Sequence, residues 1–143
     1  MKIITQTEKQ TQSFGHKLAL SLRGGEIFLL HGDLGAGKTT LVQGVAKGLK
    51  IKQTVNSPTF VLMKTYPCDV NKIKNFIHID TYRGLSEEDL INIGALEYFK
   101  RKDCVSFVEW GATLEDWLKK ERLKFHLIEI KNISENEREI EIK

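Results

Sequence analysis

The apolar positions of this chain follow two kinds of spacing that alternate along the sequence. Spacings of three and four residues after Thr7, and again after Lys38, predict two amphipathic helices. Short apolar or extended runs predict strands at 27–31, 60–66, 76–80 and 105–108. Strands that alternate with helices favour a mostly parallel central sheet with helices on both faces, so we expect a three-layer α/β fold.

Local signals predict where several helices begin and end. Thr7 followed by Gln10 is typical of a capping box, and Gly24-Gly25 would end the first helix. Ser86 would cap a later helix that has an acidic first turn and breaks at Gly94.

The C-terminal part predicts a helix at 113–120 followed by two strands. These strands, 123–131 and 138–143, flank a polar turn and predict an antiparallel hairpin. No linker, internal repeat or low-complexity tract interrupts the sequence. We therefore expect residues 1–143 to form a single domain.

The composition narrows the class of protein without identifying a partner. Hydrophobic residues make up 41% of the chain and charged residues 29%, as in an ordinary soluble globule. There is no apolar signal region or membrane-length run, and Cys68 and Cys104 lack a metal-binding spacing. We expect a cytoplasmic protein with no membrane or DNA partner. The net charge of +3 permits contact with a nucleic acid but does not predict it.

Residues Gly32 to Thr39 form a complete phosphate-binding motif between the strand at 27–31 and a helix. Glycines let successive backbone N–H groups face one concavity, to which the helix N-terminus adds about half an elementary charge. Lys38 would reach the β- and γ-phosphates, and the Thr39 hydroxyl would bind Mg²⁺. A plain strand-to-helix turn is the alternative, but it needs neither the lysine nor the hydroxyl. We expect a P-loop NTPase-like fold whose nucleotide contacts include Asp33, Leu34, Gly35, Ala36, Gly37, Lys38, Thr39 and Thr40.

Two further apolar runs end in acidic residues, Asp80 and Glu109. In an open α/β sheet the ligand lies beyond the carboxyl ends of the strands, so neighbouring strands would aim both acids at the Mg²⁺ on Thr39. Either carboxylate alone could instead meet solvent or cap a helix. We favour Glu109 as the direct ligand, with Asp80 beside it, and leave open which acid touches the ion.

Two segments near these acids predict a switch or a partner contact. Ser57-Pro58-Thr59 occupies the place where many nucleotide hydrolases sense the γ-phosphate through a hydroxyl, although a plain turn is the alternative. In an extended chain His78, Asp80 and Tyr82 would share one face. His78 alone is more often a structural histidine, and the sequence does not choose a partner for Arg83.

The identity of the nucleotide is indicated by a motif that the sequence lacks. A guanine-reading Asn-Lys-x-Asp run is missing, because lysine stands at position 74 where the acid should be. We therefore expect ATP rather than GTP. There is also no evident Arg-rich lid, which disfavours a small-molecule kinase.

Four motifs in order give this chain a specific resemblance. Gly-Asp-Leu-Gly-Ala-Gly-Lys-Thr-Thr at 32–40, Asn-Ser-Pro-Thr-Phe at 56–60, His-x-Asp-x-Tyr-Arg at 78–83 and Glu-Trp at 109–110 resemble the TsaE (YjeE) family. The resemblance implies that functional positions of the family fall on Lys38, Thr39, Thr59, Asp80, Glu109 and Trp110. It also implies that the adenine lies near Glu8.

The resemblance further implies a small bacterial ATPase that helps form threonylcarbamoyladenosine on tRNAs reading codons that begin with A. Such a protein binds the TsaB–TsaD pair, is linked to tRNA indirectly through it, and supports repeated turnover through its ATP cycle; whether this chain also contacts tRNA directly stays open. A partner-activated ATPase is therefore the first hypothesis. A small-molecule kinase and a nucleotide-gated binding module are the alternatives.

Overall fold

The computed structural model describes residues 1–33, 35–56, 63–81, 86–110 and 114–143. Its strands are β1 (Lys2–Thr5), β2 (Ile27–His31), β3 (Met63–Val70), β4 (Ile73–Asp80), β5 (Cys104–Glu109), β6 (His126–Asn132) and β7 (Arg138–Ile142). They form one sheet in the order β1-β7-β6-β2-β5-β4-β3. Strands β1, β6, β2, β5 and β4 run in one direction and only β7 and β3 oppose them. The mostly parallel sheet and the C-terminal antiparallel hairpin are therefore both confirmed.

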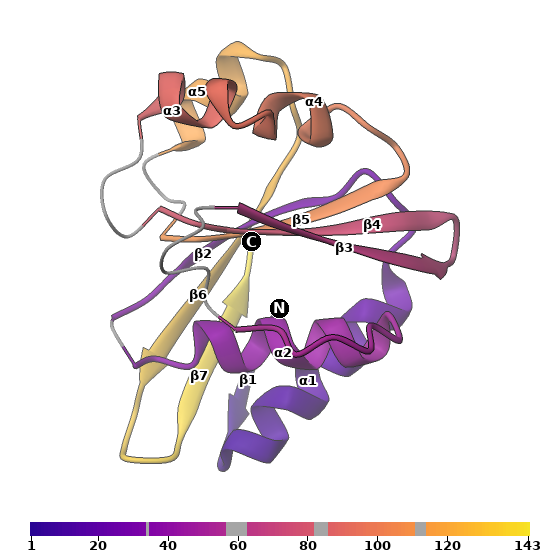
Figure 1. Ribbon diagram of the computed structural model, residues 1–143. Helices are drawn as coiled ribbons and strands as arrows, with labels where there is room; N and C mark the ends of the chain where they lie inside the picture. Colours follow the sequence, from indigo (N-terminus) through magenta and orange to yellow (C-terminus); the bar gives the residue numbers. More distant parts are fainter. Residues whose placement is uncertain (34, 57–62, 82–85, 111–113) are drawn as a thin grey trace.

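Helices cover both faces of this sheet. They are α1 (Glu8–Ser21), α2 (Lys38–Gly48), α3 (Glu87–Asn92), α4 (Ala95–Phe99) and α5 (Glu115–Lys120). Helices α1 and α2 lie on one face, and α3, α4 and α5 lie on the other (Figure 1). This arrangement confirms the expected three layers. None of the helices in these ranges is long and apolar enough to cross a membrane.

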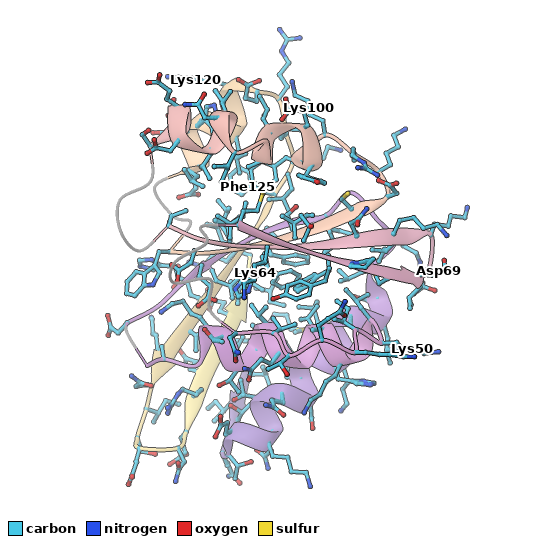
Figure 2. All side chains as sticks on the ribbon, viewed as in Figure 1. Lys50, Lys64, Asp69, Lys100, Lys120 and Phe125 are labelled. Carbon is cyan, nitrogen blue, oxygen red and sulfur yellow. The ribbon has the colours of Figure 1, made fainter. Side chains whose placement is uncertain are left out.

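Each face of the sheet has its own apolar core, because successive residues of a strand point to opposite sides. In β2, Phe28 and Leu30 pack toward α1 and α2, while Ile27 and Leu29 pack toward α3, α4 and α5. Side chains fill both spaces between sheet and helices, with the labelled Phe125 on the α3–α5 side (Figure 2). The same alternation decides which polar side chains face α2 at the ends of β4 and β5.

Helices α1 and α2 approach each other closely where glycines leave room. A Cβ atom at Gly44 would lie 2.1 Å from the backbone oxygen of Gln12, and one at Gly15 would lie 2.4 Å from that of Leu41. Because both obstacles are backbone atoms, the helices would have to move apart to accept a side chain.

We expect Gly44→Ala to lower the free energy of unfolding by about 1–3 kcal/mol, the usual cost of overpacking a well-packed core. The gain in helix propensity is at most about 1 kcal/mol and does not offset a shift of the whole helix pair. Urea unfolding would measure the change, with Lys17→Ala on the exposed side of α1 as control. An unchanged midpoint would contradict the close approach of α1 and α2.

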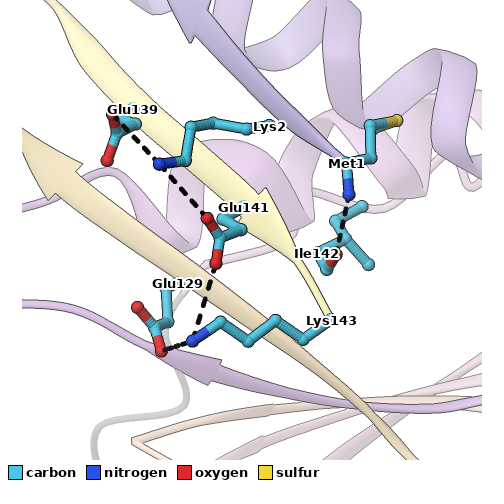
Figure 3. A network of polar contacts seen from close by, with 7 residues as sticks. All are labelled: Met1, Lys2, Glu129, Glu139, Glu141, Ile142 and Lys143. Atoms are coloured by element: carbon cyan, nitrogen blue, oxygen red, sulfur yellow. Dashed lines mark hydrogen bonds and ion pairs between the residues drawn. The ribbon is translucent and has the colours of Figure 1, made fainter.

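Strand β1 was absent from the sequence prediction, and the structure shows why it forms. It lies at the sheet edge and depends on pairing with β7 at the other end of the chain. Charged side chains bridge this edge: Lys2 contacts Glu139 and Glu141, and Lys143 contacts Glu129 and Glu141 (Figure 3). Exposed ion pairs contribute about 0–1 kcal/mol each, so backbone pairing is the main stabilising interaction.

The hairpin of β3 and β4 is longer than the apolar runs indicated. Its turn residues Asn71 and Lys72 have φ values of 53° and 69°, the left-handed region needed for a tight two-residue turn. Pro67 argues against a central strand, but β3 is an edge strand, where a missing N–H is tolerated.

Candidate active site

The phosphate-binding motif lies at the carboxyl end of β2, where the chain enters α2 (Figure 1). Strand β5 is the direct neighbour of β2, with Leu30 opposite Glu109, and β4 follows with Asp80 opposite Glu109. The three strand ends that the sequence analysis singled out are therefore adjacent. Glu109 shares a face with Phe107, and Asp80 with Phe76, so both acids lie on the α2 side of the sheet.

Glycines shape the loop between β2 and α2. Gly35 and Gly37 have φ values of 78° and 101°, which residues with a side chain rarely adopt. Gly37 caps α2 without any side-chain hydrogen bond to the helix. The first backbone N–H groups of a helix have no partner within it, so this uncapped start is suited to an anion.

Lys38 is buried at the start of α2, with 4% of its surface exposed. Its Nζ donates to the carbonyl oxygens of Gly32 at 2.7 Å and Asp33 at 2.8 Å. Burial lowers the pKa of Lys38, whereas the charges of Glu109, Asp80 and Asp33 act to raise it. Burial outweighs these charges, so the pKa of Lys38 lies below its usual value while its side chain is held at the loop.

Glu109 is buried to a similar extent, and side chains of α2 and β4 contact its carboxylate. The Thr39 hydroxyl donates to its Oε1 at 2.9 Å and to its Oε2 at 3.2 Å. His78 Nε2 lies 2.5 Å from the same Oε2, and the His78 side chain is fully buried. That His78 shares a face with Asp80 was expected from the sequence, but its contact with Glu109 was not.

The residues present fit a hard cation that prefers oxygen ligands. The hydroxyl of Thr39 and the carboxylate of Glu109 are in direct contact, and Asp80 is the neighbour of Glu109 across the ladder. Mg²⁺ keeps several waters and needs few protein oxygens. No group of three His, Cys, Asp or Glu suited to a metal is found in the described ranges, so the fit rests on this smaller oxygen set.

Trp110 follows Glu109 in an unusual backbone conformation, with φ of 62°. Thr81 holds this turn, because its hydroxyl donates to the backbone oxygens of Glu109 at 3.1 Å and Trp110 at 2.8 Å. The indole ring centroid lies 4.0 Å from the Nζ of Lys38, a cation–π distance. Trp110 therefore lies beside Lys38 at the phosphate-binding loop.

Arg138 lies at the start of β7. It was not singled out from the sequence, because it is one of many charged residues in the C-terminal segment. Its Nη2 donates to the Gly35 oxygen at 3.4 Å, and its Nη1 donates to three carbonyl oxygens of the turn before β7. Its partner in β1 is Thr5, which precedes by three residues the exposed Glu8 in the first turn of α1. The start of α1 and the β6–β7 turn thus lie at the same end of the sheet as the loop.

The remaining expected residues are placed as follows. Gly35 and Asp33 are exposed, Ala36 is buried, and Thr40 is half-buried in the first turn of α2. Six others lie outside the described residues: Leu34, Ser57, Pro58, Thr59, Tyr82 and Arg83.

Comparison with known proteins identifies the family of this chain and agrees with its fold. The family described as "Threonylcarbamoyl adenosine biosynthesis protein TsaE" matches residues 5–140. The tRNA threonylcarbamoyladenosine biosynthesis protein TsaE of Bacillus subtilis (strain 168) is 39% identical over 140 residues, which cover 98% of this chain and 83% of that protein. The protein of the same name from Aquifex aeolicus (strain VF5) is 33% identical over 143 residues, covering 99% and 94%.

A solved structure extends the similarity to three dimensions. The crystal structure of Bacillus subtilis YdiB matches with a TM-score of 0.73 at 34% identity, covering 98% of this chain and 82% of that one. The family match spans well over half of the chain, and relatives above 30% identity align along almost all of it. This chain therefore belongs to the TsaE family, whose role is in threonylcarbamoyladenosine biosynthesis.

Proposed function

We propose that this protein is a Mg²⁺-dependent ATPase that supports threonylcarbamoyladenosine formation on tRNA by acting with the TsaB–TsaD pair. The observation that carries the proposal is the convergence of Lys38, Thr39 and Glu109 at an uncapped helix start. A phosphate-binding loop, a buried lysine and an acid bonded to the loop threonine are the parts that phosphoryl transfer needs.

The residues of the chain have separate parts in this reaction. The N–H groups at the start of α2 would bind the phosphates, and the Nζ of Lys38 would exchange its loop carbonyls for phosphate oxygens. Mg²⁺ held by Thr39 and Glu109 would supply positive charge against the phosphate oxygens. Asp80, next to Glu109, would orient the attacking water. Thr59 is proposed as the γ-phosphate sensor and Glu8 as an adenine contact.

Activation by a partner is proposed because catalysis of phosphoryl transfer is mainly positioning and charge stabilisation, which a second protein can supply. Arg138 also touches the loop, but its guanidinium is already bonded to four carbonyl oxygens of the chain. Ser57, Pro58, Tyr82, Arg83 and Trp110 are the residues that we propose for the switch or the partner surface.

The proposal is tested by measuring phosphate release from ATP with the chain alone and with the TsaB–TsaD pair added. We expect slow release alone and much faster release with the pair. The same mixture containing Lys38→Ala is the control, because it reports any hydrolysis due to the partners themselves. Equal rates with and without the pair would contradict partner activation.

The two alternatives predict different products. A small-molecule kinase would form ADP only with an added hydroxyl substrate, and the phosphate would be transferred rather than released. A nucleotide-gated binding module would bind ATP without turning it over. A single-turnover measurement with the partners present, following labelled γ-phosphate, separates all three.

Nucleotide binding is expected to change the fluorescence of Trp110. Its ring lies against the Nζ of Lys38, and that contact must change when the ammonium group turns to a phosphate. The control is Trp110→Phe, which leaves Trp117 as the single tryptophan, buried in α5 on the other face of the sheet. If the wild-type signal does not respond to ATP, or if Trp110→Phe responds equally, the assignment to Trp110 is wrong.

A further inference from the structure

His78 and Glu109 form a buried polar pair next to the site. His78 is fully buried in β4, Glu109 is 3% exposed in β5, and His78 Nε2 lies 2.5 Å from Glu109 Oε2. Both side chains point to the α2 side of the sheet, where Phe76 and Phe107 form the apolar surroundings. Burying a histidine costs free energy unless its ring nitrogens form hydrogen bonds. The contact with Glu109 offsets part of that cost for His78.

The surroundings of the imidazole indicate which nitrogen carries the proton. Glu109 offers oxygen atoms as acceptors, so Nε2–H is the donor in this contact. His78 Nδ1 is also buried, and it has no hydrogen-bond partner among the described residues. A proton on Nδ1 would leave a second N–H buried without an acceptor, which is unfavourable. Nε2 is therefore the ring nitrogen that this structure favours as the donor to Glu109.

This donor limits how the Glu109 carboxylate can turn. Oε2 is held by His78 from the neighbouring strand, and Oε1 lies 2.9 Å from the Thr39 hydroxyl. Without His78, the hydrogen bond from Thr39 would remain as the side-chain hydrogen bond that the described residues give to this carboxylate, which could then rotate about its terminal bonds. Carboxylates that bind metals are commonly fixed in this way by hydrogen bonds from residues behind them.

We propose that His78 is a positioning residue, which holds the Glu109 carboxylate at Thr39 by donating its Nε2–H to Oε2. This inference rests on the proposed metal-binding function of Thr39 and Glu109. His78 itself touches neither nucleotide nor metal in this proposal. The alternative is that His78 only fills space in the core, in which case its hydrogen bond would not matter for the metal.

Two substitutions separate these possibilities. His78→Gln keeps an N–H donor at a similar distance from the backbone, whereas His78→Leu keeps much of the volume and removes the donor. For each protein, calorimetry gives the dissociation constant for ATP with Mg²⁺ and for ATP with a chelator. The ratio of the two constants is the gain in affinity due to the metal, which a purely structural role would leave unchanged.

We expect this gain to fall about 10–100-fold in His78→Leu, the range known for residues that support metal ligands. His78→Gln should retain most of the gain, and affinity without metal should stay similar in all three proteins. If His78→Leu gains as much affinity from the metal as the wild type does, the positioning role of His78 is wrong, while the proposed metal site is unaffected. A wild-type protein that binds ATP equally with and without metal would overturn the metal site, and this inference with it.

A spectroscopic measurement tests the same point in the unaltered protein and does not depend on folding of a variant. Two-bond ¹H–¹⁵N correlation spectra of histidine-labelled protein distinguish the ring tautomers. We expect Nε2 of His78 to carry a proton. Protonation at Nδ1 in place of Nε2 would overturn the proposal, because the contact with Glu109 would then lack its donor.

Discussion

Replacing Lys38 with alanine is expected to abolish ATP turnover and to weaken ATP binding. Lys38 is buried at the loop with its ammonium group bonded to Gly32 and Asp33, so the group already lies beside the phosphate site and needs only to exchange these carbonyls for phosphate oxygens. Removing one preorganised donor of this kind typically lowers kcat by about 10²–10³-fold. Phosphate release with the partners present, together with the dissociation constant for ATP, measures both effects.

The control for Lys38→Ala is Lys47→Ala in the last turn of the same helix. Lys47 is exposed, and the substitution makes the same change in net charge without touching the loop. A circular dichroism melt would check that Lys38→Ala still folds, since two loop carbonyls lose their donor. If Lys38→Ala hydrolyses ATP at the wild-type rate, Lys38 does not act on the phosphates.

The parts of the fold that the sequence predicted well are those with local signals. The strand 27–31 was predicted with the bounds of β2, because a dense apolar run is followed at once by the glycine loop. Ser86 caps α3 through the reciprocal bonds of a capping box with Asp89. At Thr7 the box is incomplete: Thr7 accepts from the Gln10 N–H, but the Gln10 side chain accepts from Gln6 instead.

The parts that the sequence did not predict depend on pairing between distant segments. Strand β1 forms only because β7 provides its ladder, and the contact of Arg138 with Gly35 joins residues 103 positions apart. The site shows the same contrast. Glu109 and Asp80 could be predicted at neighbouring strand ends because acids that follow apolar runs are visible in the sequence, whereas the contact of His78 with Glu109 follows from the register of β4 against β5.

Replacing Glu109 with alanine is expected to remove Mg²⁺-dependent hydrolysis while sparing much of the binding of ATP. The loop N–H groups and Lys38 remain in place, so affinity for ATP in a chelator should change little. The Thr39 hydroxyl loses its partner in the proposed metal site, and turnover should fall to the level of the Lys38→Ala protein. Phosphate release with Mg²⁺, and ATP affinity with and without it, measure the two effects.

The substitution also has a structural cost that must be separated from the loss of metal binding. Glu109→Ala leaves the buried Nε2–H of His78 without an acceptor, which costs about 1–3 kcal/mol of stability. Glu109→Gln is the matched variant, because its amide oxygen still accepts from one donor while the negative charge is gone. If the charge is what binds Mg²⁺, both variants lose hydrolysis, but only Glu109→Ala melts markedly earlier. Hydrolysis that persists in Glu109→Gln would instead assign the metal to Asp80, the other acid at this edge of the sheet.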